Sequence, residues 1–277
     1  MSDTGWRLLL DSPQPGAWNM AVDEALLDEV AAGGIPTLRF YAWSPPCLSL
    51  GYFQRFEVVD TDGCRSLGVD IVRRPTGGRA ILHDRELTYS LTLPADRLGH
   101  DAGVLPSYYR ISRALQAGLA ALGVATTMAP ESAAARSLDA GPICFDRPSA
   151  HEILLFGRKL VGSAQVRREN AILQHGSILI EPRLERLAAC LRLPAGTAGS
   201  LVDGVVGLAE IGMLDTQQLA RALSDAVARE FGVGMVPGRL AASEKARATG
   251  LMADKYQSIG WTERPLETTP LKTTRTR

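Results

Sequence analysis

The chain has 277 residues, 45% of them hydrophobic, and its 30 basic side chains balance its 30 acidic ones. This composition supports a real core and excludes a protein that attracts nucleic acid or anionic membranes over its whole surface. No apolar run approaches the roughly 20 residues of a membrane span, and the start lacks a secretory signal. The four cysteines (Cys47, Cys64, Cys144 and Cys190) have no C-x-x-C spacing. We therefore expect a cytoplasmic protein with reduced thiols and no bound metal.

The N-terminal part predicts a strand, a helix and then short strands. Trp6–Leu10 has the composition of a strand. Apolar residues from Trp18 to Val30 recur at three- and four-residue steps, which indicates an amphipathic helix that Gly33-Gly34 can end. Three strand candidates follow, at 37–42, 48–52 and 69–73.

The segment from Arg73 to Ser90 carries the most concentrated chemistry and reads R-R-P-T-G-G-R-A-I-L-H-D-R-E-L-T-Y-S. Paired glycines let a backbone approach a ligand closely, and neighbouring arginines suit anionic groups. A basic turn between two strands explains the same residues equally well. Alternation of apolar and polar residues from Leu87 to Leu93 then predicts a half-buried strand.

The second half predicts another helix, a hairpin and a helical end. A helix at 108–122 closes at Gly123, and two strands at 152–156 and 160–166 flank a tight turn around Gly157-Arg158. A strand at 172–180 follows, and the pattern becomes helical after about residue 182. We expect one α+β domain over residues 1–260 with a mostly antiparallel mixed sheet and flanking helices, and a disordered tail over 261–277.

Two strand-borne motifs in this half could contact a ligand. In Gly157-Arg158-Lys159-Leu160-Val161-Gly162-Ser163-Ala164-Gln165, a lysine opens a strand and small residues follow it, although most lysines at such turns are simply exposed. In Gln174-His175-Gly176-Ser177, a histidine interrupts an apolar strand, and a hydrogen-bonded core histidine is an equal alternative.

Cys144 lies in Pro142-Ile143-Cys144-Phe145-Asp146-Arg147-Pro148-Ser149, between a loop and a new strand. A thiolate at such a position can act as a nucleophile when nearby cations lower its pKa. Burial as a small hydrophobic side chain is the usual fate of a free cysteine and is the alternative here.

Taken in order, R-R-P-T-G-G-R-A-I-L-H-D, G-R-K-L-V-G-S-A-Q and L-Q-H-G-S-I-L resemble the motifs of the biotin/lipoate protein ligase and acyltransferase family. Asn19-Met20-Ala21-Val22-Asp23-Glu24 also resembles the family's opening helix. The resemblance implies the mixed antiparallel sheet already expected, and transfer of an acyl group to a lysine of a small carrier domain.

Two departures from the ligases point to a subgroup. The loop has Arg79 where ATP-dependent lipoate ligases typically have a third glycine, and the part after residue 182 is short for an adenylation domain. Cys144-Phe145-Asp146 resembles the acyl-accepting cysteine of octanoyltransferases that take octanoate from acyl carrier protein. An ATP- and magnesium-dependent lipoate ligase, an octanoyl or lipoyl amidotransferase and a non-catalytic acyl-binding relative remain the alternatives.

By this resemblance Cys144 is the nucleophile of a thioester intermediate, Lys159 touches the acyl carbonyl, and no cofactor is required. The expected acceptor is a lipoyl carrier, such as the glycine-cleavage H protein or a 2-oxoacid dehydrogenase lipoyl domain. The surrounding arginines, Arg85 included, are expected to attract the acidic acyl carrier protein. The expected substrate-binding residues are Arg73, Arg74, Gly77, Gly78, Arg79, His83, Asp84, Gly162, Ser163, Gln165 and His175.

Overall fold

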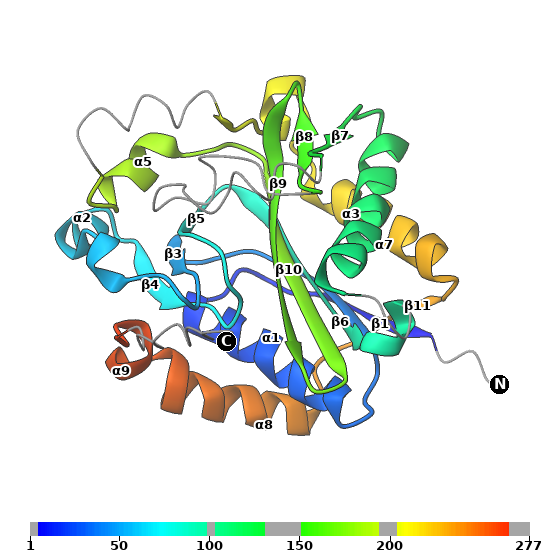
Figure 1. Ribbon diagram of the computed structural model, residues 1–277, viewed down its shortest axis with the longest axis horizontal. Coiled ribbons are helices and arrows are strands. Elements are labelled where there is room, and N and C mark those ends of the chain that lie inside the picture. The colour runs from blue at the N-terminus through cyan, green and yellow to red at the C-terminus, as the bar shows by residue number, and fades with distance from the viewer. Residues whose placement is uncertain (1–4, 99–102, 131–150, 194–203, 266–277) are drawn as a thin grey trace, which may run out of the picture.

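The computed structural model describes residues 5–98, 103–130, 151–193 and 204–265, and its main element is an eight-stranded sheet (Figure 1). The strand order is β11-β1-β2-β6-β10-β9-β8-β7. The β1 strand pairs in parallel with β11 and β2, and every other pair in this sheet is antiparallel. The strands are β1 (Trp6–Leu10), β2 (Thr37–Tyr41), β6 (Glu86–Pro94), β7 (Thr127–Met128), β8 (Ile153–Leu155), β9 (Arg158–Arg168), β10 (Ala171–Leu179) and β11 (Met235–Pro237).

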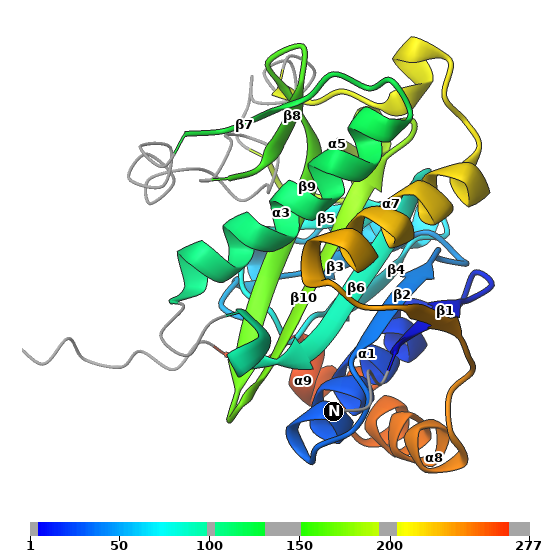
Figure 2. The ribbon, with the colours of Figure 1, turned by 90° about the vertical axis from the view of Figure 1, so that its right-hand side faces the viewer.

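Helices cover both faces of this sheet (Figure 2). Helices α3 (Val104–Ala121) and α7 (Thr216–Phe231) pack on one face, where their apolar stripes share a core cluster with β6, β9 and β10. Helices α1 (Gly16–Ala31) and α8 (Ala242–Leu251) lie on the other face. The predicted α+β fold with a mostly antiparallel mixed sheet is therefore confirmed.

A second sheet of three strands, in the order β4-β3-β5, lies beside the large one. It consists of β3 (Cys47–Leu50), β4 (Asp70–Arg73) and β5 (Ile81–His83), with β3–β4 parallel and β3–β5 antiparallel. Its apolar face packs in a separate cluster that includes residues of α2 (Thr61–Ser66) and α5 (Leu184–Ala189).

The predicted hairpin joins β8 to β9 through Phe156 and Gly157, one residue earlier than the sequence suggested. Their φ angles are +54° and +74°. Two central residues with positive φ match the twist of antiparallel strands, which explains the tight connection.

The β6 strand differs from its prediction. The alternation predicted a half-buried strand, but every residue from Glu86 to Leu93 is buried. The reason is that α1 packs over the face that carries Thr88, Ser90 and Thr92, so the polar side chains of this strand are inside the protein.

The C-terminal end also differs from the expected tail. Residues 261 and 262 end α9 (Ile259–Thr262), which follows a π-helical turn over Met252–Tyr256. The remaining residues of the expected tail, 266–277, lie outside the described residues. Short 3-10 turns occupy Phe56–Val58, Ala95–Leu98 and Leu208–Ile211. Within the part of the chain that the structure describes, the helices are too short or too polar to cross a lipid bilayer.

Candidate active site

A narrow pocket lies where the two sheets meet α1. Its apolar lining includes Met20, Tyr41 and Ile81, together with Trp43 from the segment that links the sheets. The polar lining comes from the small sheet, from the end of β4 and from β6, β9 and β10. The lining extends from residue 20 to residue 177, so distant parts of the chain build one site.

The loop over residues 74–79 follows β4 directly, and we call it the donor loop because the family resemblance implies that it contacts the acyl donor. The Arg74 guanidinium donates to the Gly77 carbonyl at 2.7 Å and to the Arg79 carbonyl at 2.8 Å, so the loop closes around its own first side chain. Gly78 has a φ of +92°, and a Cβ added at Gly51 would lie 1.9 Å from the Gly78 carbonyl oxygen. The close backbone approach therefore requires glycine at Gly51, just after β3, and the positive φ favours glycine at Gly78.

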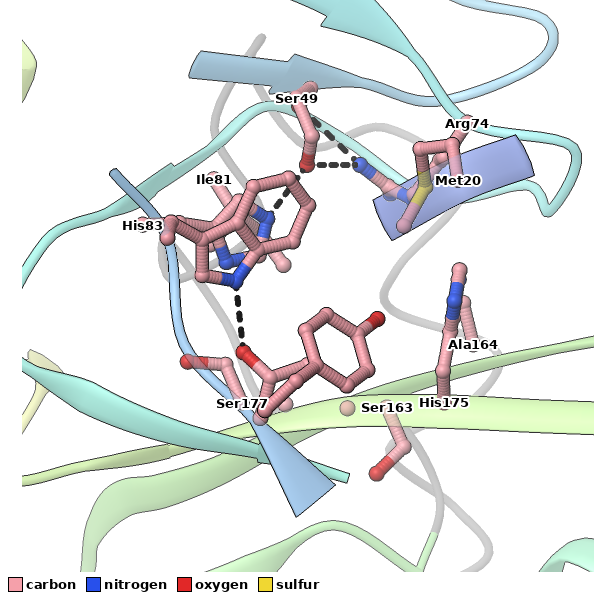
Figure 3. Close-up of a pocket in the computed structure, with 14 residues that line it drawn as sticks. Met20, Ser49, Arg74, Ile81, His83, Ser163, Ala164, His175 and Ser177 are labelled. Carbon is pink, nitrogen blue, oxygen red and sulfur yellow. Dashed lines mark hydrogen bonds between the residues drawn. The ribbon is translucent and has the colours of Figure 1, made fainter. Parts of the chain in front are cut away.

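Arg74 also begins a chain of hydrogen bonds along one wall of the pocket (Figure 3). It donates to the Ser49 hydroxyl at 3.2 Å, and this hydroxyl lies 2.8 Å from Nε2 of His83. Nδ1 of His83 lies 2.6 Å from Glu86. The His83 ring stacks on Trp43 with a centroid separation of 3.9 Å. This wall of the pocket therefore combines hydrogen-bonded polar side chains with the stacked rings of Trp43 and His83.

His175 lies in a second chain of this kind. Its Nε2 is 2.7 Å from the Thr76 hydroxyl of the donor loop, and its Nδ1 is 3.0 Å from Asp23 on α1. Burial lowers the pKa of His175 and outweighs the opposing attraction of Asp23, which favours a neutral ring.

Asp23 is fully buried and accepts hydrogen bonds from Arg39, Tyr41 and Ser90 as well as from His175. Burial alone would raise the pKa of Asp23, but the hydrogen bond from His175 and the charge of Arg39 outweigh it, and the net pKa is lowered. Asp23 therefore remains a carboxylate inside the protein.

Arg73 does not line the pocket. Its buried guanidinium donates to the backbone carbonyls of Gly51 and Gln54 near β3 and to those of Trp261 and Thr262 in α9. The first arginine of the motif therefore ties three segments together beneath the donor loop. Its predicted contact with substrate stays a prediction.

Lys159 opens β9 and is fully buried, and its ammonium lies 2.6 Å from Glu152 beside β8. It is not among the residues that line the pocket. The pair holds an ammonium group in a fixed position inside the protein.

The remaining predicted residues divide into two groups. Gly162 and Ser163 line the pocket with Arg74, His83 and His175, whereas Gly77, Gly78, Arg79, Asp84 and Gln165 do not. Asp84 pairs with Arg186, and Gln165 donates to Gln174.

Cys144 lies outside the described residues. The other cysteines, Cys47, Cys64 and Cys190, are buried and form no disulfide. Burial raises the pKa of Cys47 well above its ordinary value, and a hydrogen bond to Cys190, together with burial, raises that of Cys64. The expectation that these three are structural agrees with their surroundings.

Sequence reasoning missed several polar residues of the site. They are Asp23, Ser49, Thr76, Glu86 and Glu152. A signal existed for Asp23, because this charged residue falls among the apolar positions of an amphipathic helix. Ser49 and Thr76 carried no such signal, since hydroxyl residues are common at strand ends and in loops.

Comparison with known proteins identifies the family. The lipoyl protein ligase A/B catalytic domain matches residues 15–228. The octanoyltransferase LipM of Moorella thermoacetica is 41% identical, with 94% of this chain and 98% of that protein covered. The octanoyltransferase LipM of Staphylococcus aureus is 35% identical, with 94% and 99% covered.

Solved structures agree with the fold. Lipoate-protein ligase A bound with ATP superposes with a TM-score of 0.80 at 24% identity, covering 94% of this chain and 99% of that one. A bipartite lipoate protein ligase from Thermoplasma acidophilum, solved in a study that included its E2 lipoyl domain, gives a TM-score of 0.79 at 24% identity, covering 94% and 96%. The chain belongs to the lipoyl protein ligase A/B catalytic domain family, and its full-length relatives at 35–41% identity are octanoyltransferases.

Proposed function

We propose that this chain is an octanoyltransferase of lipoate biosynthesis, which moves octanoate from acyl carrier protein to a lysine of a lipoyl-carrier protein through a thioester on Cys144. The observation that carries this proposal is the 35–41% identity with octanoyltransferases over nearly the whole length of both chains. The ordered motifs and the pocket between the two sheets support it. We place the reaction in the cytoplasm, where the nucleophilic thiol stays reduced.

In the first half-reaction the Cys144 thiolate attacks the octanoyl carbonyl of the donor thioester. The carbon–sulfur bond to the donor breaks, the donor leaves as a thiolate that takes up a proton from solvent, and the octanoyl group stays on Cys144. The buried charge of Lys159, held by Glu152, is suited to favour the thiolate and to orient the carbonyl. We assign the pocket beside the donor loop to the octanoyl chain, because Met20, Tyr41 and Ile81 give it an apolar lining.

In the second half-reaction the acceptor lysine attacks the Cys144 thioester as a neutral amine. An amide forms, the amine proton passes to solvent or to the leaving thiolate, and the Cys144 thiol is regenerated. Conversion of a thioester to an amide makes this half strongly downhill. The donor is already activated, so we expect transfer without ATP or a metal ion.

Replacement of Cys144 tests the covalent step. We expect Cys144→Ala to lose at least 10³-fold in octanoyl transfer, which corresponds to about 4 kcal/mol of barrier, because no other group can carry the acyl chain. Intact-protein mass spectrometry of wild type mixed with octanoyl-acyl carrier protein should show one added octanoyl group that hydroxylamine removes. Cys190→Ala is the matched control and should retain the adduct. A Cys144→Ala enzyme with near wild-type activity would exclude this mechanism.

The donor is tested separately. Octanoyl-acyl carrier protein without ATP is compared with free octanoate or lipoate plus ATP and magnesium, with a glycine-cleavage H protein and a lipoyl domain as acceptors. The proposal expects product only from the first donor. Product only from the free acid with ATP would instead assign the chain as a lipoate ligase.

A further inference from the structure

The donor loop is attached to both sheets, and the two attachments have different chemistry. On the side of the small sheet, the backbone N–H of Tyr52 donates to the Thr76 carbonyl at 2.8 Å, and the Arg74 side chain reaches the Ser49 carbonyl at 3.1 Å. On the side of the large sheet, the Thr76 hydroxyl meets Nε2 of His175 on β10 at 2.7 Å. The Thr76 hydroxyl therefore joins the loop to β10, the strand that forms part of the pocket wall.

The polarity of this second attachment follows from Asp23. A carboxylate can only accept hydrogen bonds, so the Nδ1 of His175 that faces Asp23 carries the proton. In the neutral ring the opposite nitrogen, Nε2, is then an acceptor, and the Thr76 hydroxyl must donate to it. Asp23 is held in place by Arg39 at 2.9 Å and by the hydroxyls of Tyr41 and Ser90, each at 2.8 Å.

All members of this chain are buried. Thr76 and Asp23 show no exposed surface, and His175 is 5% exposed. Loss of the Thr76 hydroxyl leaves the largely buried His175 acceptor without this partner, and an unsatisfied buried acceptor is costly. The arrangement is thus specific for a hydroxyl at position 76.

We propose that Thr76, His175 and Asp23 form a positioning device that holds the donor loop in its donor-binding position, with Thr76 as the residue through which it acts. This inference rests on the proposed function, because it takes the loop over residues 74–79 to contact the octanoyl donor. Thr76 and Asp23 act through their neighbours on the position of the loop and take no part in the chemistry at the acyl carbonyl.

The proposal predicts that loss of the Thr76 hydroxyl raises KM for the donor and leaves kcat unchanged. Without the hydrogen bond from Thr76 to His175, the loop spends part of its time in positions that do not bind the donor. The apparent affinity for the donor is then the intrinsic affinity multiplied by the fraction of time that the loop spends in the binding position. Once the donor is bound, its own contacts restore the loop, so turnover is unchanged. A merely structural defect behaves differently, because it reduces the amount of folded enzyme and hence the apparent kcat at constant KM.

The test is Thr76→Val, with Thr76→Ser as the conservative rescue. We expect Thr76→Val to raise the KM for octanoyl-acyl carrier protein about tenfold with kcat within twofold, and Thr76→Ser to return KM to within twofold of wild type. Thr92→Val is the matched control, since Thr92 is buried on β6 and its hydroxyl has no hydrogen-bond partner among the described residues. It should leave KM unchanged.

A measurement without substrate accompanies the kinetics. The Tyr52 amide donates to the Thr76 carbonyl, so its hydrogen exchange reports on the loop. We expect this amide to exchange at least fivefold faster in Thr76→Val than in wild type, and at the wild-type rate in Thr92→Val.

Two results would overturn the device: an unchanged KM with unchanged Tyr52 exchange in folded Thr76→Val, or the same KM increase in Thr92→Val. Failure of the proposed function looks different. In that case wild type does not use octanoyl-acyl carrier protein at all, and the exchange measurement still decides whether the tether holds the loop.

Discussion

At the scale of single residues, the buried Lys159–Glu152 pair has the sharpest energetic consequence. Both side chains are at most 2% exposed, and their charged atoms lie 2.6 Å apart. A buried ion pair contributes little net stability compared with apolar residues of the same size, yet the removal of one partner leaves an uncompensated charge. The pair is therefore weak evidence for a gain in stability, and it agrees with the role proposed for the Lys159 ammonium group.

This explanation predicts the behaviour of single and double variants. Glu152→Gln should lower the free energy of unfolding by about 3 kcal/mol, because Lys159 loses its counter-charge. The double variant Glu152→Met/Lys159→Met should recover most of that loss and remain inactive in octanoyl transfer. Urea unfolding and the acyl-enzyme assay measure the two quantities. Recovery of activity in the double variant would show that the ammonium group is not needed.

At the scale of elements, α9 is attached to the base of the donor loop through Trp261. The indole Nε1 donates to the Arg73 carbonyl at 2.9 Å, while the Arg73 side chain returns hydrogen bonds to the carbonyls of residues 261 and 262. Lys255 lies 4.1 Å above the Trp261 ring, and Tyr52 contacts its edge. These contacts connect the last helix to the loop that precedes β5.

We expect Trp261→Ala to lower the free energy of unfolding by about 2 kcal/mol, through lost ring packing and the lost hydrogen bond to Arg73. Ile259→Ala is the control on the same short helix, because Ile259 is 71% exposed and should change stability by less than about 0.5 kcal/mol. Denaturant titration of both variants measures these changes in the free energy of unfolding. Equal effects would mean that α9 contributes nothing specific at Trp261.

At the scale of the whole molecule, the buried network around Asp23 couples stability to pH. The pKa of His175 is lowered from its ordinary value of 6.5, first by burial, so the unfolded chain takes up a proton more readily than the folded one. Burial alone would raise the pKa values of Asp23 and Glu24. Their partners, foremost His175 for Asp23 and Lys255 for Glu24, lower them from 3.8 and 4.5. All three shifts remove stability as the pH falls.

The free energy of unfolding should therefore decline in two stages. The first stage begins as the pH falls through about 6.5, where His175 of the unfolded chain becomes protonated. The second stage begins below about 4.5, where the carboxylates of the unfolded chain become protonated. His175→Gln should remove the first stage and keep the second. Denaturant midpoints measured from pH 8 to pH 3.5 test this, and a flat profile between pH 6.5 and 5 in wild type would contradict it.

The sequence predicted the order of most elements and the identity of the family, because hydrophobic periodicity and ordered motifs are local signals. It did not predict the burial of Thr88, Ser90 and Thr92. Alternation of apolar and polar residues indicates a strand with one buried face, whereas α1 packs over the second face of β6 as well. The partner of His83 was missed for the same reason, because Glu86 resembles a surface residue of a half-exposed strand, whereas the position of Asp23 among apolar helix residues was a signal that was not used. The substrate contact of Arg73 stays a prediction, and only the tertiary structure shows that its guanidinium donates to carbonyls of α9.

The pocket lining extends from Met20 to Ser177, and Trp261 contacts the base of the donor loop beside it. During synthesis the opening helix therefore emerges from the ribosome long before its partners in the site exist. Asp23 can contact His175 only after β10 has been made, and the base of the donor loop can contact Trp261 only after α9 has been made. The pocket is thus among the last parts of the described structure to be completed, because it includes residues of β10 and borders a loop that contacts α9.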